Sequence, residues 1–492
     1  MEEYAAIKLI QTLCRRLKEE RVVYCHWKSN AAIARSASGE NDLDLLVSRT
    51  DQQPFTEILR QLGFKETAAE ADRTFPGVTH SYGFDSDANR FVHIHAHFQL
   101  VVGQDATKNY HLPIEDAYLA SSSSDGLFMV PAVEFELILL VIRLTIKHSS
   151  YSARLLREGR LSSAERNELQ YLIDRASKPK MDQILKDHLP SIPPDLFETC
   201  LQNLSSNAVW SIRQRSGRKL LRCLASFTRY SPVTDFRLKI WRRVKGSFGR
   251  RILRREDKMR FTHGGMMVAI VGGDGSGKTT AIGELERWLS ADFVTRQYHM
   301  GKPDWSALTI LVRGILKIGR SLGFYPFMRA EIQYTHDPTR LEFPGMPWLL
   351  REVCTGRDRY LTYMKAKKVT ANGGIAILDR FPLKQIQFMD GPQAVRMTQM
   401  IPRTKWIQYL IHLEESYYQK ISLPDLLIVL HVGPEVAVQR KTTEIAEEVR
   451  ARAAEIWEID WSQTPAKVID ASHSREKVLS DLKELIWSQL SS

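Results

Sequence analysis

A glycine-rich segment directly follows an apolar run near the middle of the chain. The run at residues 266–271 is typical of a buried strand, and residues 272–280 read Gly-Gly-Asp-Gly-Ser-Gly-Lys-Thr-Thr. Apolar residues then recur at helical spacing, at Ile282, Leu285 and Leu289. A strand, a glycine-rich turn ending in Lys-Thr and a helix form a phosphate-binding loop, or P-loop. This order constrains the fold most, because it predicts an α/β unit that holds a nucleoside triphosphate.

The residue types of the loop suit that chemistry. Gly272 and Gly277 let backbone N–H groups converge on phosphate oxygens, Lys278 reaches the outer phosphates, and Thr279 ligates magnesium at the helix N-terminus. The predicted nucleotide-binding set is Gly272, Gly273, Asp274, Gly275, Ser276, Gly277, Lys278, Thr279 and Thr280. A glycine-rich turn with a chance lysine is the alternative, and the correct strand and helix on either side disfavour it.

A second apolar segment ends in two charged residues. Residues 375–378 read as a strand, and Asp379 and Arg380 follow. A carboxylate at a strand end suits magnesium-bound water, and a guanidinium suits a bidentate grip on phosphate. The pair therefore predicts a metal ligand and a phosphate ligand, with a surface ion pair as the simpler alternative.

Two more strands and a charged segment complete this half. Residues 426–432 form a strand after Pro424-Asp425, and residues 468–472 close the sheet before a final amphipathic helix. The charged residues between these strands include Arg440, Lys441, Arg450 and Arg452. A solvated helix face explains such a charged segment equally well when it is taken alone.

These motifs, taken in order, resemble a known family. Residues 264–490 resemble the thymidylate kinase family of nucleoside monophosphate kinases. The matching pieces are the P-loop with Asp274, Asp358-Arg359 followed by a helix and Gly373, Asp379-Arg380, the Pro-Asp strand at 424–432, Arg440, and residues 469–472. The resemblance implies a P-loop kinase domain on a parallel sheet, with ATP and Mg²⁺ as cofactors.

The resemblance also implies roles for the matching side chains. Lys278 and Thr279 would handle ATP and magnesium, and Arg440 would belong to a lid that closes over the donor and keeps water out. The residues facing the acceptor would be Asp274, Arg359 and Arg380. The predicted catalytic residues of this half are Lys278, Asp274, Arg380 and Arg440, and its predicted metal ligands are Thr279 and Asp379.

The sequence departs from the family where the acceptor sits. Residues 296–303 stand in place of an Arg-Glu-Pro-Gly run, and residues 381–384 lack the expected Tyr and Ser. The predicted acceptor is a nucleoside monophosphate, with dTMP first. Residues 305–343 form an inserted stretch with an apolar and a basic side, for which a second-layer packing helix is favoured over a membrane-surface helix.

Two aspartates lie on one face of a predicted strand in the N-terminal half. Residues 39–47 read Gly-Glu-Asn-Asp-Leu-Asp-Leu-Leu-Val, so strand periodicity places Asp42 and Asp44 opposite the core, where they could share a divalent metal. In residues 91–100 the same periodicity puts apolar residues inward. The residues on the other face are His93, His95 and His97.

Residues 20–110 resemble the polymerase-beta-like nucleotidyltransferase superfamily in a turn followed by the Asp42-x-Asp44 strand, although the turn reads Lys28-Ser29 where the superfamily commonly has Gly-Ser. The resemblance implies that Asp42 and Asp44 are catalytic metal ligands, and that a further acid completes a two-metal site. His93 or His95 occupies the place of that acid. An active transferase, a degenerate nucleotide-binding relative and an unrelated α+β domain all remain open.

Composition and breaks divide the chain into four parts. We predict a nucleotidyltransferase-like α+β domain at 1–125, a helical domain at 126–236, a basic linker at 237–262 and a thymidylate-kinase-like α/β domain at 263–492. The net charge is +12, and residues 237–260 alone carry eleven Lys or Arg against two acidic residues. Such a run predicts a solvated helix or linker, with nucleic acid or acidic lipid as alternative partners.

The remaining sequence features limit the location and the function that we expect for the protein. We find no signal peptide and no transmembrane run, and the five scattered cysteines suit a reducing cytosol, so we expect a cytoplasmic protein. The expected function is ATP-dependent phosphoryl transfer to a nucleoside monophosphate or another small phosphorylated substrate. The alternative is a nucleotide-sensing regulatory protein with a P-loop switch. A homodimer is compatible with both.

Overall fold

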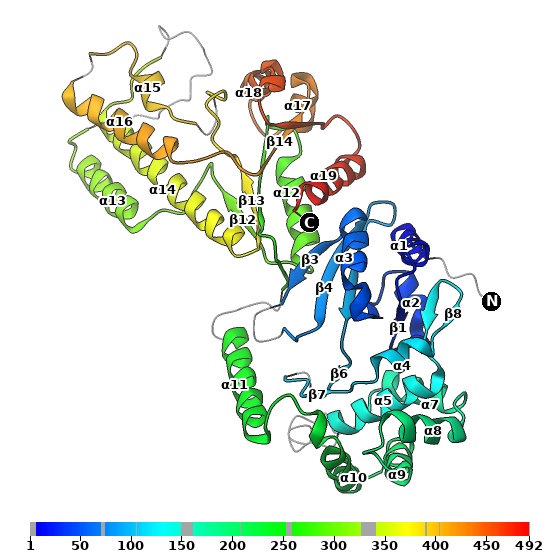
Figure 1. Cartoon of the computed structure of the whole chain (residues 1–492). Helices are drawn as coiled ribbons and strands as arrows, with labels where there is room; N and C mark the ends of the chain where they lie inside the picture. Colours follow the sequence, from blue (N-terminus) through cyan, green and yellow to red (C-terminus); the bar gives the residue numbers. More distant parts are fainter. Residues whose placement is uncertain are drawn as a thin grey trace. The chain divides into compact units, whose positions relative to one another are not determined.

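The computed structural model describes residues 6–491 apart from 70–73, 105, 149–160, 207, 252–257, 326–340, 389–390 and 403. For residues 246–251 it describes the backbone but not the side chains. The chain divides into two compact units, Met1–Asp257 and Lys258–Ser491. Figure 1 shows both units, and each is described by itself.

The first unit contains a mixed sheet, as expected for an α+β part. Within this unit the strand order is β1-β2-β5-β4-β3. The strands are β1 (Tyr24–His26), β2 (Leu43–Val47), β3 (Lys65–Ala68), β4 (Val78–Asp85) and β5 (Arg90–His97). β2 and β5 are parallel and in register from Leu43 opposite Ile94, while the other neighbours are antiparallel. The carboxylate strand and the histidine strand are therefore direct neighbours.

One face of this sheet is covered by α1 (Lys8–Glu19) and α3 (Gln52–Gln61). Alternate residues of both central strands enter this core, as period-two packing requires. The core residues of β2 and of β5 with its continuation are Leu43, Leu45, Val47, Val92, Ile94, Ala96 and Phe98. The predicted alternation is confirmed for these residues, so the intervening aspartates and histidines lie on the opposite face.

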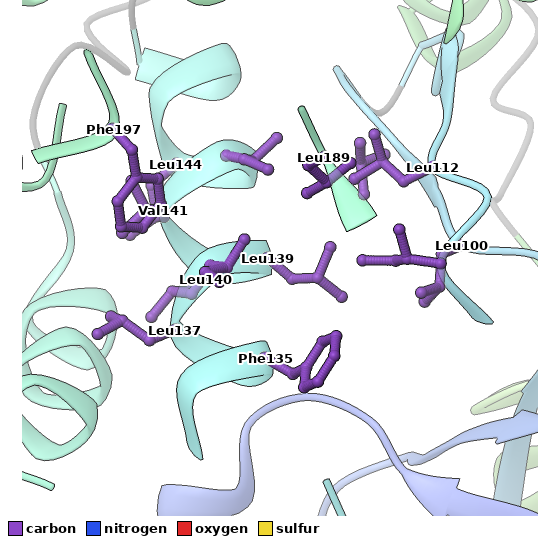
Figure 2. Close-up of a cluster of buried hydrophobic side chains, with 14 of the residues drawn as sticks. Leu100, Leu112, Phe135, Leu137, Leu139, Leu140, Val141, Leu144, Leu189 and Phe197 are labelled. Atoms are coloured by element: carbon purple, nitrogen blue, oxygen red, sulfur yellow. The ribbon is translucent and has the colours of Figure 1, made fainter. Parts of the chain in front are cut away.

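Helices that follow the sheet pack around α5 (Val133–His148). The surrounding helices are α7 (Ser163–Ile173), α8 (Lys178–His188), α9 (Pro194–Ser205) and α10 (Trp210–Cys223). Figure 2 shows α5 presenting Leu139 and Phe135 on the side of Leu100 and Leu112, while Phe197 meets its other side. Because α5 is the central helix, its apolar residues are buried nearly all round.

Short elements connect the sheet to these helices. They are α2 (Ile33–Ala37), α4 (Glu115–Ala120), β6 (Val101–Val102), β7 (Tyr110–His111), β8 (Ser123–Asp125) and β9 (Phe128–Val130). The boundary predicted after residue 125 falls inside the β8–β9 hairpin. Phe128 of this hairpin belongs to the core that α1 and α3 share with the sheet.

Much of the predicted basic linker is helical. It lies on α11 (Pro232–Arg251), which begins five residues before the linker was expected. Buried Asp235 accepts hydrogen bonds from the Thr107 hydroxyl at 2.6 Å and from Lys239 at 2.5 Å, and these contacts fix the start of the helix. Phe236 and Trp241 are exposed on it, by 63% and 65%. This segment is therefore a helix with both cationic and apolar exposed side chains.

The second unit contains the predicted parallel sheet. Its five strands follow the order β12-β13-β11-β14-β15, and every pairing is parallel. The strands are β11 (Met266–Gly272), β12 (Thr295–His299), β13 (Ile375–Asp379), β14 (Leu426–His431) and β15 (Lys467–Asp470), and Arg260–Phe261 (β10) precedes them. The central strand β11 is buried throughout, as a parallel strand covered on both faces should be.

The helices of this unit are α12 (Lys278–Ser290), α14 (Met346–Ala371), α15 (Ala394–Met397), α16 (Lys405–Gln419), α17 (Pro434–Arg440), α18 (Ala446–Glu458) and α19 (Arg475–Gln489). Helix α16 packs against α14, and α15 packs against α16. Tyr363 and Ala366 of α14 share a core with Met267 and Ala269 of β11, so α14 covers that face. Helices α12 and α19 contact each other (Figure 1).

The inserted stretch contains the helix α13 (Ala307–Ser321), which contacts α14. This contact agrees with the predicted second-layer packing helix, although part of its apolar face is exposed in the described part of the chain. Leu308, Leu311 and Ile315 are 47–59% exposed, and Thr309 is the residue of this helix that is buried. The part of 305–343 at residues 326–340 lies outside the described residues.

Candidate functional site

The P-loop connects the end of β11 to the start of α12. Gly275 and Gly277 have φ angles of 78° and 85°, in the left-handed region that favours glycine. A Cβ at Gly275 would lie 2.5 Å from the Ala437 carbonyl oxygen of α17. A Cβ at Gly273 would lie 2.8 Å from the Cα of Ala453 on α18. The loop conformation and the close approach of both helices therefore require glycine.

Lys278 lies under the loop. Its ammonium donates to the Gly273 carbonyl at 2.6 Å, and the residue is 6% exposed. Burial lowers the pKa of Lys278 to about 8, although the nearby Asp274 carboxylate acts in the opposite direction. Incoming phosphates would favour the charged form of this lysine, because an opposite charge raises the pKa of an amine.

Three cationic side chains meet the Asp274 carboxylate, which is 3% exposed. Arg452 Nη1 lies 2.7 Å from Asp274 Oδ2, and Arg380 Nη2 lies 3.3 Å from Oδ1. Lys441 Nζ lies 3.9 Å from Oδ1. These cations come from the end of β13, the end of α17 and the middle of α18. We call Asp274, Arg380, Lys441 and Arg452 the Asp274 cluster; it gathers positive charge beside the P-loop.

Glu444 orients two members of this cluster. Its carboxylate contacts Lys441 Nζ at 2.9 Å and Arg452 Nη2 at 2.6 Å. Charge-assisted contacts of this kind fix long flexible side chains in one orientation. The connection between α17 and α18 thereby holds its cations toward the loop.

Oxygen atoms suited to a divalent ion lie beside the loop. Asp379 is 6% exposed, and its Oδ1 is buried with no hydrogen-bond partner among the described residues. The Ser276 hydroxyl is likewise buried without a partner there, while Thr279 is exposed beside it. Leaving a buried carboxylate oxygen unpaired costs about 1–3 kcal/mol or more. These hard oxygen donors fit Mg²⁺, which prefers such ligands.

Arg359 and Arg440 are placed differently from the Asp274 cluster. Buried Arg359 donates to the Met300 carbonyl at 2.9 Å and also contacts the Tyr418 hydroxyl. Arg440 donates to the carbonyls of Ala471 and Ser472 at 2.7 and 3.3 Å. Both guanidinium groups thus bind main-chain carbonyls in this structure. Their predicted acceptor and lid roles stay predictions.

Sequence reasoning did not single out Lys441 and Arg452. Both belong to the charged stretch that follows β14, in which Arg440 is the residue predicted to act in the site. Helical periodicity alone cannot show which residue of α18 meets a loop some 180 positions earlier in the chain. One sequence feature could have helped: Arg452 is two positions after Arg450, so the two arginines must lie on different sides of the same helix.

The predicted N-terminal residues form a second cluster. Asp44 Oδ1 lies 2.8 Å from Lys28 Nζ and 3.1 Å from His95 Nδ1. Burial raises the pKa of Asp44, but the His95 hydrogen bond and the Lys28 charge outweigh it and hold that pKa well below its usual range. Asp42 is 57% exposed at its side chain and pairs with His93 at 2.9 Å.

The turn that carries Lys28 is fixed by two helical carboxylates. Ser29 has a φ of 61° and donates its N–H to Glu168 at 3.1 Å. Asn30 donates its N–H and its side-chain amide to Glu136 at 3.1 and 2.9 Å. Burial raises the pKa of Glu136 to about 7, against the lowering effect of Asn30. The helices around α5 thus position the turn beside Asp44.

This donor set does not fit two Mg²⁺ ions. The residue directly opposite Asp44 on β5 is His95, where the third acid would be needed. The Lys28 ammonium already neutralises Asp44, and Asp42 pairs with His93. Magnesium prefers carboxylate and water oxygens to imidazole nitrogens. These residues therefore do not support a catalytic step that needs two magnesium ions.

A separate groove lies beside α13 in the second unit. It has a volume of about 600 Å³ and is lined by Trp305, Arg313, Lys317, Trp348 and Arg351, among others. Arg313 lies over the Trp305 ring at 4.3 Å, a cation–π contact. None of these residues belongs to the Asp274 cluster.

A parallel sheet whose central strand leads into a P-loop defines a nucleotide-binding class of unit. The chain is similar to the uncharacterized ATP-binding protein YghS of Escherichia coli K12, with 25% identity over 229 residues that cover 46% of this chain and 94% of YghS. It is also similar to the uncharacterized ATP-binding protein YghR of the same strain, with 23% identity over 45% of this chain and 86% of YghR. No protein-family model matches the chain.

None of the helices in the described part of the chain is long and apolar enough to cross a membrane.

Proposed function

We propose that the second unit binds ATP and transfers its terminal phosphoryl group to a nucleoside monophosphate, with dTMP as the first acceptor to test. The observation that carries this proposal is the convergence of Arg380, Lys441 and Arg452 on Asp274 beside the P-loop. The printed names of the two similar Escherichia coli proteins support ATP as the nucleotide.

The charge distribution suits phosphoryl transfer rather than nucleophilic catalysis. Such transfer depends on positioning two phosphate groups and stabilising negative charge, and needs little covalent chemistry from the protein. Lys278 would contact the outer phosphates. Arg380 enters the site from the end of β13, and Arg452 enters it from α18. The role of Asp274 is to hold these cations in place until phosphate arrives.

Magnesium fits the same site. Thr279 and Asp379 would hold the ion, which would supply positive charge to the phosphate oxygens. The buried, unpaired Oδ1 of Asp379 is the feature of this chain that favours such an ion.

The test is acceptor-dependent ADP formation by the full chain. We expect one member of a panel of nucleoside monophosphates and sugar phosphates to raise ADP formation, with mass spectrometry detecting the phosphorylated acceptor. Lys278→Ala should abolish this activity, whereas Lys477→Ala, on the exposed face of α19, should retain it. Slow ATP hydrolysis that no acceptor changes would favour the nucleotide-sensing alternative instead.

A further inference from the structure

A row of imidazoles lines the sheet face of the first unit that is opposite the core of α1 and α3. It comes from neighbouring strands β4 and β5 and faces the carboxylates of β2. Its members are His80, His93, His95 and His97, with Asp42 and Asp44 beside them. The His80 and His95 rings stack at 4.4 Å, and His95 and His97 lie 4.3 Å apart.

Three of these side chains are grouped closely enough to share an ion. One ligand atom from each of Asp44, His95 and His97 lies within 4.8 Å of the other two. Ligand atoms around a tetrahedral Zn²⁺ at about 2.1 Å lie roughly 3.4 Å apart, so small side-chain rotations would close the set. Of the other three members, His93 contacts Asp42 at 2.9 Å through Nδ1 and His80 at 3.0 Å through Nε2.

Two of the three ligands have nitrogens without partners. His97 is 1% exposed, and neither of its ring nitrogens has a hydrogen-bond partner among the described residues. His95 uses Nδ1 toward Asp44, and its Nε2 is buried without a partner in the same part of the chain. Buried polar atoms in native structures nearly always have a partner. Packing against Trp27 at 4.9 Å accounts for an aromatic ring at His97 but not for two ring nitrogens to which no described residue hydrogen-bonds.

We propose that Asp44, His95 and His97 bind one transition-metal dication of the Zn²⁺, Fe²⁺ and Co²⁺ class. Two imidazoles and one carboxylate suit these ions and disfavour Mg²⁺. A three-ligand set also leaves a coordination position open for water or an anionic ligand such as phosphate.

Lys28 is the counter-cation of the metal-free site. Its ammonium lies 2.8 Å from Asp44 Oδ1, where it competes with a metal for the same oxygen. The metal must displace this ammonium, so Lys28 weakens metal binding without being a ligand. The turn that carries it is held by Glu136 and Glu168 and need not unfold for the side chain to leave.

The experiment is a Co²⁺ titration of the full chain after chelator treatment, followed by the visible d–d absorption of the bound ion. We expect one equivalent to bind, with Zn²⁺ displacing it and a large excess of Mg²⁺ leaving it in place. His97→Gln should weaken binding by more than about 100-fold, since even residues beyond the ligands typically contribute 10- to 100-fold. The matched control is His93→Gln on the same strand, which should change the affinity by less than about threefold.

Three further variants make the outcome decisive. Asp44→Asn keeps the side-chain size and should lose binding like His97→Gln, which covers the case in which His97→Gln fails to fold. Lys28→Met should tighten binding, because it removes the competing cation. Lys278→Ala, in the other unit, should leave the Co²⁺ spectrum unchanged, which separates this site from the proposed kinase. No bound Co²⁺ in the parent chain, equal loss with His93→Gln, or displacement by Mg²⁺ would each overturn the proposal.

Discussion

Two arginines two positions apart on α18 have different surroundings. Arg452 contacts the buried carboxylate of Asp274 at 2.7 Å, whereas Arg450 makes an exposed pair with Glu435. If the Asp274 cluster grips phosphate, Arg452→Ala should lower kcat/KM for phosphoryl transfer about tenfold to a hundredfold, as for loss of a charge-assisted hydrogen bond. Arg450→Ala should change it less than about threefold. Steady-state kinetics measure both, and equal effects would remove Arg452 from the site.

The proposed acceptor-side role of Arg380 can be tested separately from ATP binding. Arg380 is 29% exposed at its side chain and reaches Asp274 from the end of β13. We expect Arg380→Ala to raise the KM of the acceptor about tenfold to a hundredfold while the Kd of ATP changes little. Calorimetry with ATP and kinetics with the acceptor provide the two values. An equal loss of ATP affinity would move Arg380 to the donor side.

The buried carboxyl of Glu136 makes stability depend on pH. Its pKa is raised to about 7 from an ordinary 4.5, so the folded chain keeps this proton after the unfolded chain has lost it. The free energy of unfolding should therefore fall as pH rises from about 4.5 to 7, by roughly 3 kcal/mol in all from this group. Glu136→Gln should flatten this slope in denaturant titrations. Glu19→Gln, on the surface of α1, should leave it unchanged.

At the level of elements, α17 and α18 press against the P-loop. Gly275→Ala places a Cβ in contact with the Ala437 carbonyl and in a backbone region that costs about 1–2 kcal/mol for other residues. We expect both the ATP affinity and the free energy of unfolding to fall. Gly283→Ala, at an unobstructed position inside α12, should instead raise stability by about 0.5–1 kcal/mol. Equal effects from the two variants would mean that the loop tolerates displacement.

The helix α13 differs from its neighbour α14 in how it is packed. Ile315 is 59% exposed on α13, whereas Leu349 on α14 is fully buried. Leu349→Ala should lower the free energy of unfolding by about 2–5 kcal/mol, and Ile315→Ser by less than about 0.5 kcal/mol. Denaturant titrations measure both values. A large effect at Ile315 would mean that its side chain is covered in the folded protein.

For the whole molecule, the sequence predicted what periodicity and local motifs determine. The strand at 266–271, the helix after Lys278 and the parallel sheet are confirmed, because a buried strand followed by a P-loop has few other ways to fold. The alternation of Asp44 and His95 against their apolar neighbours is also confirmed.

The rest depends on contacts between distant segments, which no local pattern specifies. Arg452 reaches Asp274 across 178 positions, and Glu136 fixes Asn30 across 106. Helix α13 contacts α14 as a packing helix should, but amphipathic periodicity does not identify what covers each apolar residue, so it could not predict that Ile315 is exposed. Long-range packing therefore supplied the parts of both sites that sequence reasoning missed.

We propose that the P-loop unit transfers phosphate to an acceptor with Lys278 and the Asp274 cluster. The most direct test follows an isotopic label in the γ-phosphate of ATP when the full chain turns over in the presence of dTMP and the other acceptors. We expect the label to appear on one acceptor, Lys278→Ala to abolish this transfer, and Lys477→Ala to preserve it. Label found only in inorganic phosphate with every acceptor, or transfer that survives Lys278→Ala, would disprove the proposed phosphoryl transfer.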